Sequence, residues 1–524
     1  MDNELFIVPR KKMILNRIVK RRGIINSDLD KLRHQRLITE AEESIDKVKN
    51  EVAKDRHRLK YHFMAPAYWI NDPNGLIYFG GEYHMFYQHN PYAPRWGTMH
   101  WGHAKSKDLV HWEHLPIALA PSEDYDLDKR GGCFSGSAVD DKGTLTVVYT
   151  GAVTRDGKLI QSQCLATSTD GIIFDKYGGN PIIPESPEEG SADFRDPRVW
   201  KHDDKWYAVI GSCKDGKGRA LLYRSDNLRK WDYIGVLAES DGSLGTMWEC
   251  PDFFPIGNKY VLIFSPMGMM GKNTFYIVGD MDYKTAKFTW DIIGEIDYGF
   301  DYYVTQTFLD GKGRRIIIGW INAWSWMPWW KGFGFPAAKN WCGAMSIPRI
   351  IELDDDGRLR FQPVEELKIL RDVHFGLKNT EIKPGVRVLP KEVSDNCLEI
   401  MTEFELKDCE AKELGLSLRC SVDESEVTEV SYKIKASELC FSRRRSDFGS
   451  EGLKTCKLES AGGKTLKLHI FVDTSFLEVF VDEGRACMTN NIYPQSEIRD
   501  IDLFTRGGKV KLISLDLWKL KSIW

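Results

Sequence analysis

The fold is decided by five stretches of sequence: GGEYHMFYQ from Gly80, DKGTLTVVYTG from Asp141, HDDKWYAVIGS from His202, IGNKYVLIFS from Ile256 and DGKGRRIIIGW from Asp310. Each is a polar turn that leads into a mostly apolar strand, and successive stretches start about 55 to 60 residues apart. This spacing is close to the ~40–50 residues of known β-propeller blades. The pattern predicts an all-β, five-bladed propeller over residues 61–350, with these stretches as the inner strands.

A second element follows several of these stretches: SKDLVHW from Ser106, STDGIIF from Ser168 and RSDNLRKW from Arg224. We interpret it as the outer strand of successive blades, in which Trp112 and Trp231 belong to the core.

The regions on either side of the repeats have other patterns. Residues 28–55 lack Gly and Pro and space their apolar side chains helically, so residues 1–60 are predicted to be a helical extension. Residues 351–374 are predicted to be a linker with a short helix. Strands then recur at short intervals over residues 375–524, which favours a β-sandwich. No cluster of carboxylates or histidines is evident in that region, so we expect it to be structural.

The composition limits the possible partners. A chain of 524 residues is long for one core, which favours two domains. A formal net charge of -4 gives no strong field of one sign, so neither nucleic acid nor a membrane is an expected partner. The 12% aromatic content, with 17 Trp, favours a small neutral sugar, because aromatic rings stack on the apolar faces of sugars.

The eleven cysteines are scattered, with no CxxC pair and no Cys/His spacing suited to zinc. We therefore expect reduced thiols, no metal and no cofactor. The basic N-terminus has no apolar stretch typical of a secretory signal, and no window is apolar enough to span a membrane. These features predict a cytoplasmic protein.

Three acids stand at what we take to be corresponding blade openings. They are Asp72 in WINDPNG, Asp196 in FRDPRVW and Glu249 in MWECPDFF. Asn-Asp-Pro-Asn-Gly alone is a common turn, but three acids at matching openings would converge on one funnel. Gathered carboxylates raise one another's pKa, and glycoside cleavage needs such a pair, one to attack and one to give a proton.

WINDPNG, FRDP and MWECPDFF, together with FSGS from Phe134 and YQHNP from Tyr87, resemble the invertase family, glycoside hydrolase family 32. The resemblance extends to DTSFLEVFVDEGRACMTNNIYP from Asp473, which is similar to the C-terminal sandwich of that family. Within the family, the chain looks most like the bacterial intracellular sucrose or sucrose-6-phosphate hydrolases.

The resemblance implies roles for the matching residues. Asp72 would be the nucleophile, Glu249 the acid/base, and Asp196 the group that holds two fructose hydroxyls and stabilises the transition state. Arg195 is also expected to bind the substrate, and its positive charge beside Asp196 would keep Asp196 ionised. The other positions implied to line the fructose subsite are Asn71, Gln88, Trp96, Phe134, Ser135 and Trp320.

One region departs from the family pattern, because WSWMPWWKGFGFPAAKNW from Trp324 is unusually rich in tryptophan. Trp326, Trp329 or Trp330 could stack on a sugar, or the region could pack against the C-terminal domain. A phosphorylated substrate would require a cation such as Lys331 or Lys339.

Hydrolysis of sucrose, sucrose 6-phosphate or short fructo-oligosaccharides is the leading hypothesis. A fructosyltransferase would use the same intermediate. A non-catalytic sugar-binding propeller and an inverting arabinan- or xylan-type enzyme are further alternatives. The sequence does not predict the oligomeric state.

Overall fold

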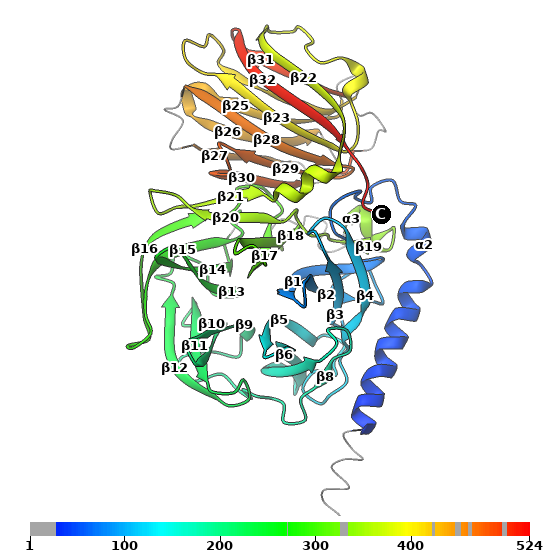
Figure 1. Cartoon of the computed structure of the whole chain (residues 1–524), viewed down its shortest axis with the longest axis vertical. Helices are drawn as coiled ribbons and strands as arrows, with labels where there is room; N and C mark the ends of the chain where they lie inside the picture. The colour runs from blue at the N-terminus through cyan, green and yellow to red at the C-terminus, as the bar shows by residue number, and fades with distance from the viewer. Residues whose placement is uncertain are drawn as a thin grey trace, which may run out of the picture.

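The computed structural model describes residues 28–269, 271–324, 334–421, 425–445, 452–458, 464–494 and 500–524. In these ranges the chain forms a ring of five sheets with a two-sheet module stacked on one side (Figure 1). The first strands of the five sheets contact one another in cyclic order and so line the central axis. The predicted five-bladed β-propeller and C-terminal β-sandwich are both confirmed.

Each blade is an antiparallel sheet whose strands follow chain order outwards. Blade one contains β1 (Tyr68–Phe79), β2 (Glu82–Asn90), β3 (His100–Ser106) and β4 (Trp112–Leu119), with the short β19 (Trp341–Cys342) parallel to β1. Blade two contains β5 (Gly132–Asp141), β6 (Thr144–Arg155), β7 (Lys158–Ser168) and β8 (Asp175–Lys176). Blade three contains β9 (Phe194–His202), β10 (Lys205–Lys214), β11 (Lys217–Ser225) and β12 (Trp231–Glu239).

Blades four and five complete the ring. Blade four contains β13 (Met247–Ile256), β14 (Lys259–Met267), β15 (Phe275–Asp282) and β16 (Lys287–Glu295). Blade five contains β17 (Tyr303–Leu309), β18 (Arg315–Trp320), β20 (Arg349–Leu353) and β21 (Leu359–Pro363). Helix α3 (Gly334–Ala337) lies between β18 and β19 in the chain.

The five repeated stretches form the second strand of each blade, not the inner strand as expected. A second strand is hydrogen-bonded on both edges and packed on both faces, so it carries the longest apolar run, as in the buried centre of β10. The inner strand is the one before it.

The second repeated element forms the turns between third and fourth strands, which corrects our assignment of it to outer strands. Asp108, Asp170 and Asn227 each accept two successive backbone N–H groups in these turns. Side-chain oxygens that bond to the backbone two and three residues on are typical of such turns. Trp112 and Trp231 start the fourth strands and pack against the core, as predicted.

The propeller extends beyond the predicted border at residue 350. β20 and β21 close the sheet of blade five, so the propeller ends at Pro363. A long connection after β18 separates the two outer strands of this blade from β18 in the chain. A single 3₁₀ turn, η1 (Glu365–Leu370), then leads into the sandwich at Arg371, which leaves a linker much shorter than 351–374.

The sandwich packs two antiparallel sheets around one apolar core. One sheet contains β22 (Arg371–Ile382), β32 (Val510–Leu520), β23 (Leu398–Glu405), β28 (Thr465–Asp473), β29 (Phe476–Val481) and β30 (Ala486–Asn491). The other contains β27 (Leu453–Lys457), β26 (Glu438–Arg445), β25 (Val427–Lys433), β24 (Glu413–Cys420) and β31 (Asp500–Arg506). Two 3₁₀ turns, η2 (Lys391–Val393) and η3 (Ile434–Ala436), lie in its loops.

A buried ionic network joins the two domains, and the sandwich contributes Asp473 and Glu478 to it. The His62 ring lies between Asp473 and Glu478, at 2.9 and 3.1 Å. Arg349 of the propeller pairs with Glu478 and, at 3.0 Å, with Asp297. The network was not visible in the sequence because its members are far apart in the chain.

The predicted N-terminal helix is present over residues 28–46 and is followed by the short α2 (Lys49–Val52). It runs along the outside of blades one and two (Figure 1). His34 and Glu42 accept hydrogen bonds from the backbone N–H groups of Ala120 and Ile117, at 3.0 and 3.1 Å. The helix therefore covers the outer edge of blade one, where unpaired strand groups would otherwise be exposed. None of the helices in the described ranges is both long and apolar enough to cross a membrane.

Candidate active site

The five innermost strands all break their register at the same place. The interruptions lie within residues 70–73 of β1, 134–136 of β5, 195–198 of β9, 249–252 of β13 and 303–306 of β17. A β-bulge turns side chains out of the ladder and is common beside active sites. The repeated bulge therefore directs residues from every blade towards the central axis.

Two rings of side chains result from this arrangement. The bulge ring consists of Asp72, Ser135, Asp196, Cys250 and Val304. The preceding ring, one residue earlier in each strand, consists of Asn71, Phe134, Arg195, Glu249 and Tyr303. Asp196, Cys250 and Val304 have positive φ angles of 65°, 47° and 47°, an uncommon and strained conformation for residues other than glycine.

The ring positions correct one prediction. Asp72 and Asp196 do occupy equivalent positions, but Glu249 stands one residue earlier than they do, and Cys250 is their equivalent in blade four. The three acids are still brought to one cavity, because adjacent positions in a bulge both face the axis.

Asp72 is buried and held by three donors. The Asn71 amide donates to Oδ1 at 2.7 Å, and the Ser135 hydroxyl and the Cys250 thiol donate to Oδ2, the thiol at 3.4 Å. Asn71 is itself fixed, since its amide oxygen accepts the indole N–H of Trp69 at 2.6 Å. These contacts fix the orientation of the carboxylate.

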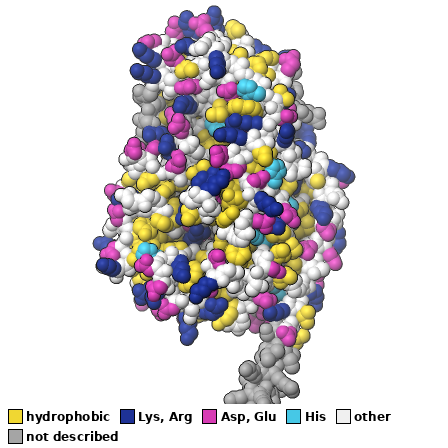
Figure 2. All heavy atoms as spheres, in the orientation of Figure 1, with side chains coloured by type: hydrophobic (Ala, Val, Ile, Leu, Met, Phe, Trp, Pro, Cys, Tyr) yellow, Lys and Arg dark blue, Asp and Glu magenta, His cyan; other side chains and the backbone are white. Residues whose placement is uncertain are grey.

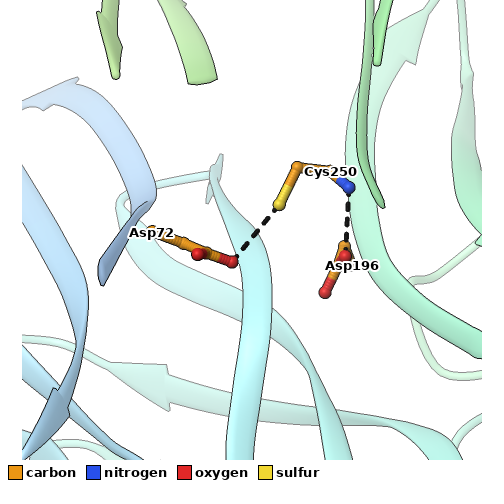
Figure 3. Close-up of side chains that lie close together, drawn as sticks. All are labelled: Asp72, Asp196 and Cys250. Carbon is orange, nitrogen blue, oxygen red and sulfur yellow. Dashed lines mark hydrogen bonds between the residues drawn. The ribbon is translucent and has the colours of Figure 1, made fainter. Parts of the chain in front are cut away.

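Asp196 lies on the other side of Cys250 (Figure 3). Its carboxylate accepts the backbone N–H of Cys250 at 3.0 Å, and its own N–H donates to the Thr150 hydroxyl at 3.0 Å. Cys250 thus contacts Asp72 through its sulfur and Asp196 through its backbone, which fixes the spacing of the two acids.

Glu249 has a separate set of partners. Arg195 donates to its Oε1 at 2.9 Å, and the Tyr303 hydroxyl donates to its Oε2 at 2.8 Å. We expected Arg195 to serve Asp196, but the contact between them is 3.9 Å, and the guanidinium binds Glu249 and Asp193 more closely.

Burial dominates the electrostatics of the two aspartates. Desolvation raises the pKa of Asp72, against the hydrogen bonds from Ser135, Asn71 and Cys250 and with the help of the nearby charge on Glu249. Desolvation also raises the pKa of Asp196 despite the attraction of Arg195, contrary to our expectation that this arginine keeps the group ionised. The site therefore holds carboxyl groups that exchange protons at a higher pH than free ones.

A cavity of about 680 Å³ contains these groups, a size typical of small-molecule sites. The three acids and the predicted Asn71, Gln88, Trp96, Phe134, Ser135 and Arg195 all line it. Trp320 does not line it. That side chain is fully buried behind the cavity and packs against Trp69 and Trp324.

Sequence reasoning missed several residues of the wall. Tyr303 could have been found, since it opens blade five as Glu249 opens blade four. Trp324 lines the cavity and stacks on Trp69, with ring centroids 5.6 Å apart. Leu159, Gln161, Met267 and Met269 come from second and third strands and their loops, and no motif marked them. Trp326, Trp329, Trp330 and Lys331 lie outside the described residues, and Lys339 is exposed after α3.

Asp72, Asp196 and Cys250 each offer a ligand atom, and these atoms lie within 4.8 Å of one another. In the described part of the chain this is the one group with metal-ligand spacing. A resident cation would occupy the oxygens needed for attack on a sugar, and a protein zinc site usually has a fourth ligand. We therefore assign no metal to this group.

Comparison with known proteins agrees with this geometry. The models for the glycosyl hydrolases family 32 N-terminal domain and C-terminal domain match residues 62–363 and 366–519. The sucrose-6-phosphate hydrolase of Escherichia coli is 39% identical over 484 residues, or 88% of this chain and 94% of that protein. The raffinose invertase of Escherichia coli is 39% identical over 479 residues, with the same coverage of both chains.

A solved structure shows the same fold. The family 32 β-fructofuranosidase of Bombyx mori superposes with a TM-score of 0.78 at 34% identity, and the match covers 93% of this chain and 98% of that one. Because both domain models match, and because a full-length relative shares more than a third of the residues, the chain belongs to glycosyl hydrolase family 32.

Proposed function

We propose that this glycoside hydrolase is a retaining β-fructofuranosidase that hydrolyses terminal non-reducing β-D-fructofuranosides such as sucrose. The observation that carries the proposal is that Asp72 and Glu249 are held by separate sets of partners in one cavity. Asp72 is fixed by Asn71, Ser135 and Cys250, while Glu249 is held independently by Arg195 and Tyr303. Two carboxyl groups with separate partners can be an attacking anion and a proton donor.

The reaction proceeds in two steps. The Asp72 carboxylate attacks the anomeric carbon of fructose, the bond to the leaving oxygen breaks, and Glu249 gives that oxygen its proton. Asp196 and Asp72 stabilise the positive charge that develops on the fructose ring. A water molecule, deprotonated by Glu249, then attacks the same carbon and frees fructose and Asp72.

The charges in the cavity support a neutral substrate. Among its described lining residues the cations are Arg195, paired with Glu249 and Asp193, and Lys272, paired with Glu295 at 2.8 Å. Around the mouth, Met267, Met269 and Trp324 present apolar surface. On these charges we propose sucrose in preference to its 6-phosphate; the relatives include enzymes of both kinds at 39% identity.

Three measurements test the proposal. Proton NMR of the first-formed product should show β-fructofuranose, since inversion at the anomeric carbon would give the other anomer. Asp72→Ala should lower turnover of sucrose by at least ~10³-fold with the fold intact, while Asp291→Ala, an exposed residue on β16, should not. A kcat/KM for sucrose 6-phosphate about tenfold above that for sucrose would contradict the choice of substrate.

The location that we propose is the cytoplasm. All eleven cysteines fall in the described ranges, and no disulfide joins any two of them. Free thiols in this number are typical of a reducing compartment.

A further inference from the structure

A second cavity, of about 820 Å³, lies between the N-terminal helix and blade two. It shares a wall with the catalytic cavity. Side chains alternate along β7, so Leu159 and Gln161 line the catalytic cavity while Ile160 and Ser162 line the second one. The two cavities are thus on opposite faces of one strand.

The acidic and basic side chains around the second cavity are equal in number, and several of them pair with one another. Its lining contains four acidic and four basic residues. Lys31 of the helix pairs with Asp175 at 2.7 Å, and Arg33 pairs with Glu123 at 2.9 Å. Such a wall attracts neither anions nor cations strongly, and Figure 2 likewise shows both signs of charge interspersed over one face of the molecule. A ligand of this cavity should be polar and uncharged.

Two hydrogen-bond donors in the cavity have no partner among the described residues. His34 is only 4% exposed, and burial lowers its pKa, so the ring is neutral. Because Nε2 accepts the N–H of Ala120 at 3.0 Å, the proton is on Nδ1, which no described residue accepts. The Tyr125 hydroxyl accepts from Asn180 at 3.1 Å, and no described residue accepts its own proton.

Apolar surface accompanies these donors. Tyr177 is 37% exposed and Ile160 is 41% exposed, and both line the cavity. An aromatic ring beside fixed hydrogen-bond donors is the combination that binds a sugar, through its apolar face and its hydroxyls. We propose that this cavity is a second carbohydrate site, which binds a neutral oligosaccharide. The choice of a fructoside as its ligand rests on the proposed function.

Gly178 allows the cavity to be blocked without disturbing the fold. It lines the cavity, and a Cβ built on it meets no atom within 4 Å. Gly178→Trp should therefore fill the site, Gly178→Ala should not, and Tyr177→Ala should remove the ring. Tyr78→Ala is the matched control, because Tyr78 is 38% exposed on β1 and lines neither cavity.

The test is calorimetric titration of full-length Asp72→Ala chain with 1-kestose. Adding Gly178→Trp should remove one binding event per chain, Tyr177→Ala should weaken that event about tenfold or more, and the two control changes should preserve it. An equal number of events and equal affinities in Gly178→Trp and its parent would overturn the proposal.

Kinetics with intact Asp72 identify the source of the ligand. If one chain reaches both cavities, Gly178→Trp raises KM for a long inulin-type oligosaccharide but not for sucrose. If the second cavity binds a separate sugar molecule, KM for the oligosaccharide and KM for sucrose both stay unchanged in Gly178→Trp, while the binding event in the titration is lost. Sucrose hydrolysis by the unaltered protein is measured alongside, so failure of the proposed function would show there and not in the titration.

Discussion

Ser135→Ala should shift the pH dependence of catalysis towards higher pH. The Ser135 hydroxyl donates to Oδ2 of Asp72, and of the bonds that hold the carboxylate it lowers the pKa of Asp72 most. Hydrogen bonds to a charged group are worth about 1.5–3 kcal/mol. Since about 1.4 kcal/mol corresponds to one pH unit, the pKa of Asp72 should rise by about one to two pH units.

The direction of the shift in the pH profile follows from the role proposed for Asp72. As the proposed nucleophile, Asp72 attacks only when ionised, so a higher pKa of this group moves the acid limb of the kcat/KM profile to higher pH. Well below both midpoints, the variant should therefore be about 10–100-fold less active than the unaltered protein. Near neutral pH the loss should be smaller, since more of Asp72 is ionised there.

The assay is kcat/KM on sucrose across the acid range, and Ser137→Ala is the control. Ser137 is on the same strand and equally buried, but its hydroxyl bonds to the backbone of Pro197 and Val199. That variant can lose stability, yet its acid limb should stay in place. An acid limb for Ser135→Ala that coincides with that of the unaltered protein would refute the assignment of Asp72 as the ionised nucleophile.

Three further predictions concern other groups. Tyr303→Phe removes the hydroxyl that donates to Glu249 at 2.8 Å and should lower kcat/KM for sucrose about 10–100-fold; an unchanged value would exclude a role for this contact. Arg349→Met removes the cation that Asp297 and Glu478 share, leaving His62 as the partner of Glu478, and should cost about 3–5 kcal/mol in denaturant unfolding, whereas Arg387→Met at a half-exposed pair should cost at most about 1 kcal/mol. Dialysis against a chelator should not change turnover, and loss of activity restored by a divalent cation would show that the three-ligand group binds a metal.

The architecture could be predicted from the sequence because the blade is a repeat. Regular second strands and their polar turns are local features, so the number of blades could be predicted. The two acids of the bulge ring could also be predicted, because they stand at matching positions in their blades. The inner strands were harder to recognise, because bulges interrupt their pattern at the point where they carry function. Asp72 therefore looked like part of a turn, although it lies within β1.

Contacts between blades could not be predicted in the same way. Arg195 precedes Asp196 in sequence, and adjacency suggested that the two are partners. The Arg195 guanidinium instead reaches Glu249, which stands at the same ring position in the next blade. Trp320 was wrongly expected to line the cavity. It lies on the second strand of blade five, farther from the axis, and is buried behind the side chain of Trp324.

The two rings explain how five similar blades separate the two roles that we propose for Asp72 and Glu249. Within the bulge ring, Ser135 and Cys250 bond to Asp72, and Cys250 also bonds to Asp196. Within the preceding ring, Arg195 and Glu249 bond to each other. Apart from the bond from Asn71 to Asp72, these hydrogen bonds run within a ring, so the proposed nucleophile and the proposed proton donor have different partners in one cavity. A shift of one residue along an inner strand is enough to move a carboxylate from one set of partners to the other. This offset, repeated around the axis, gives the blades two distinct carboxyl environments in one cavity.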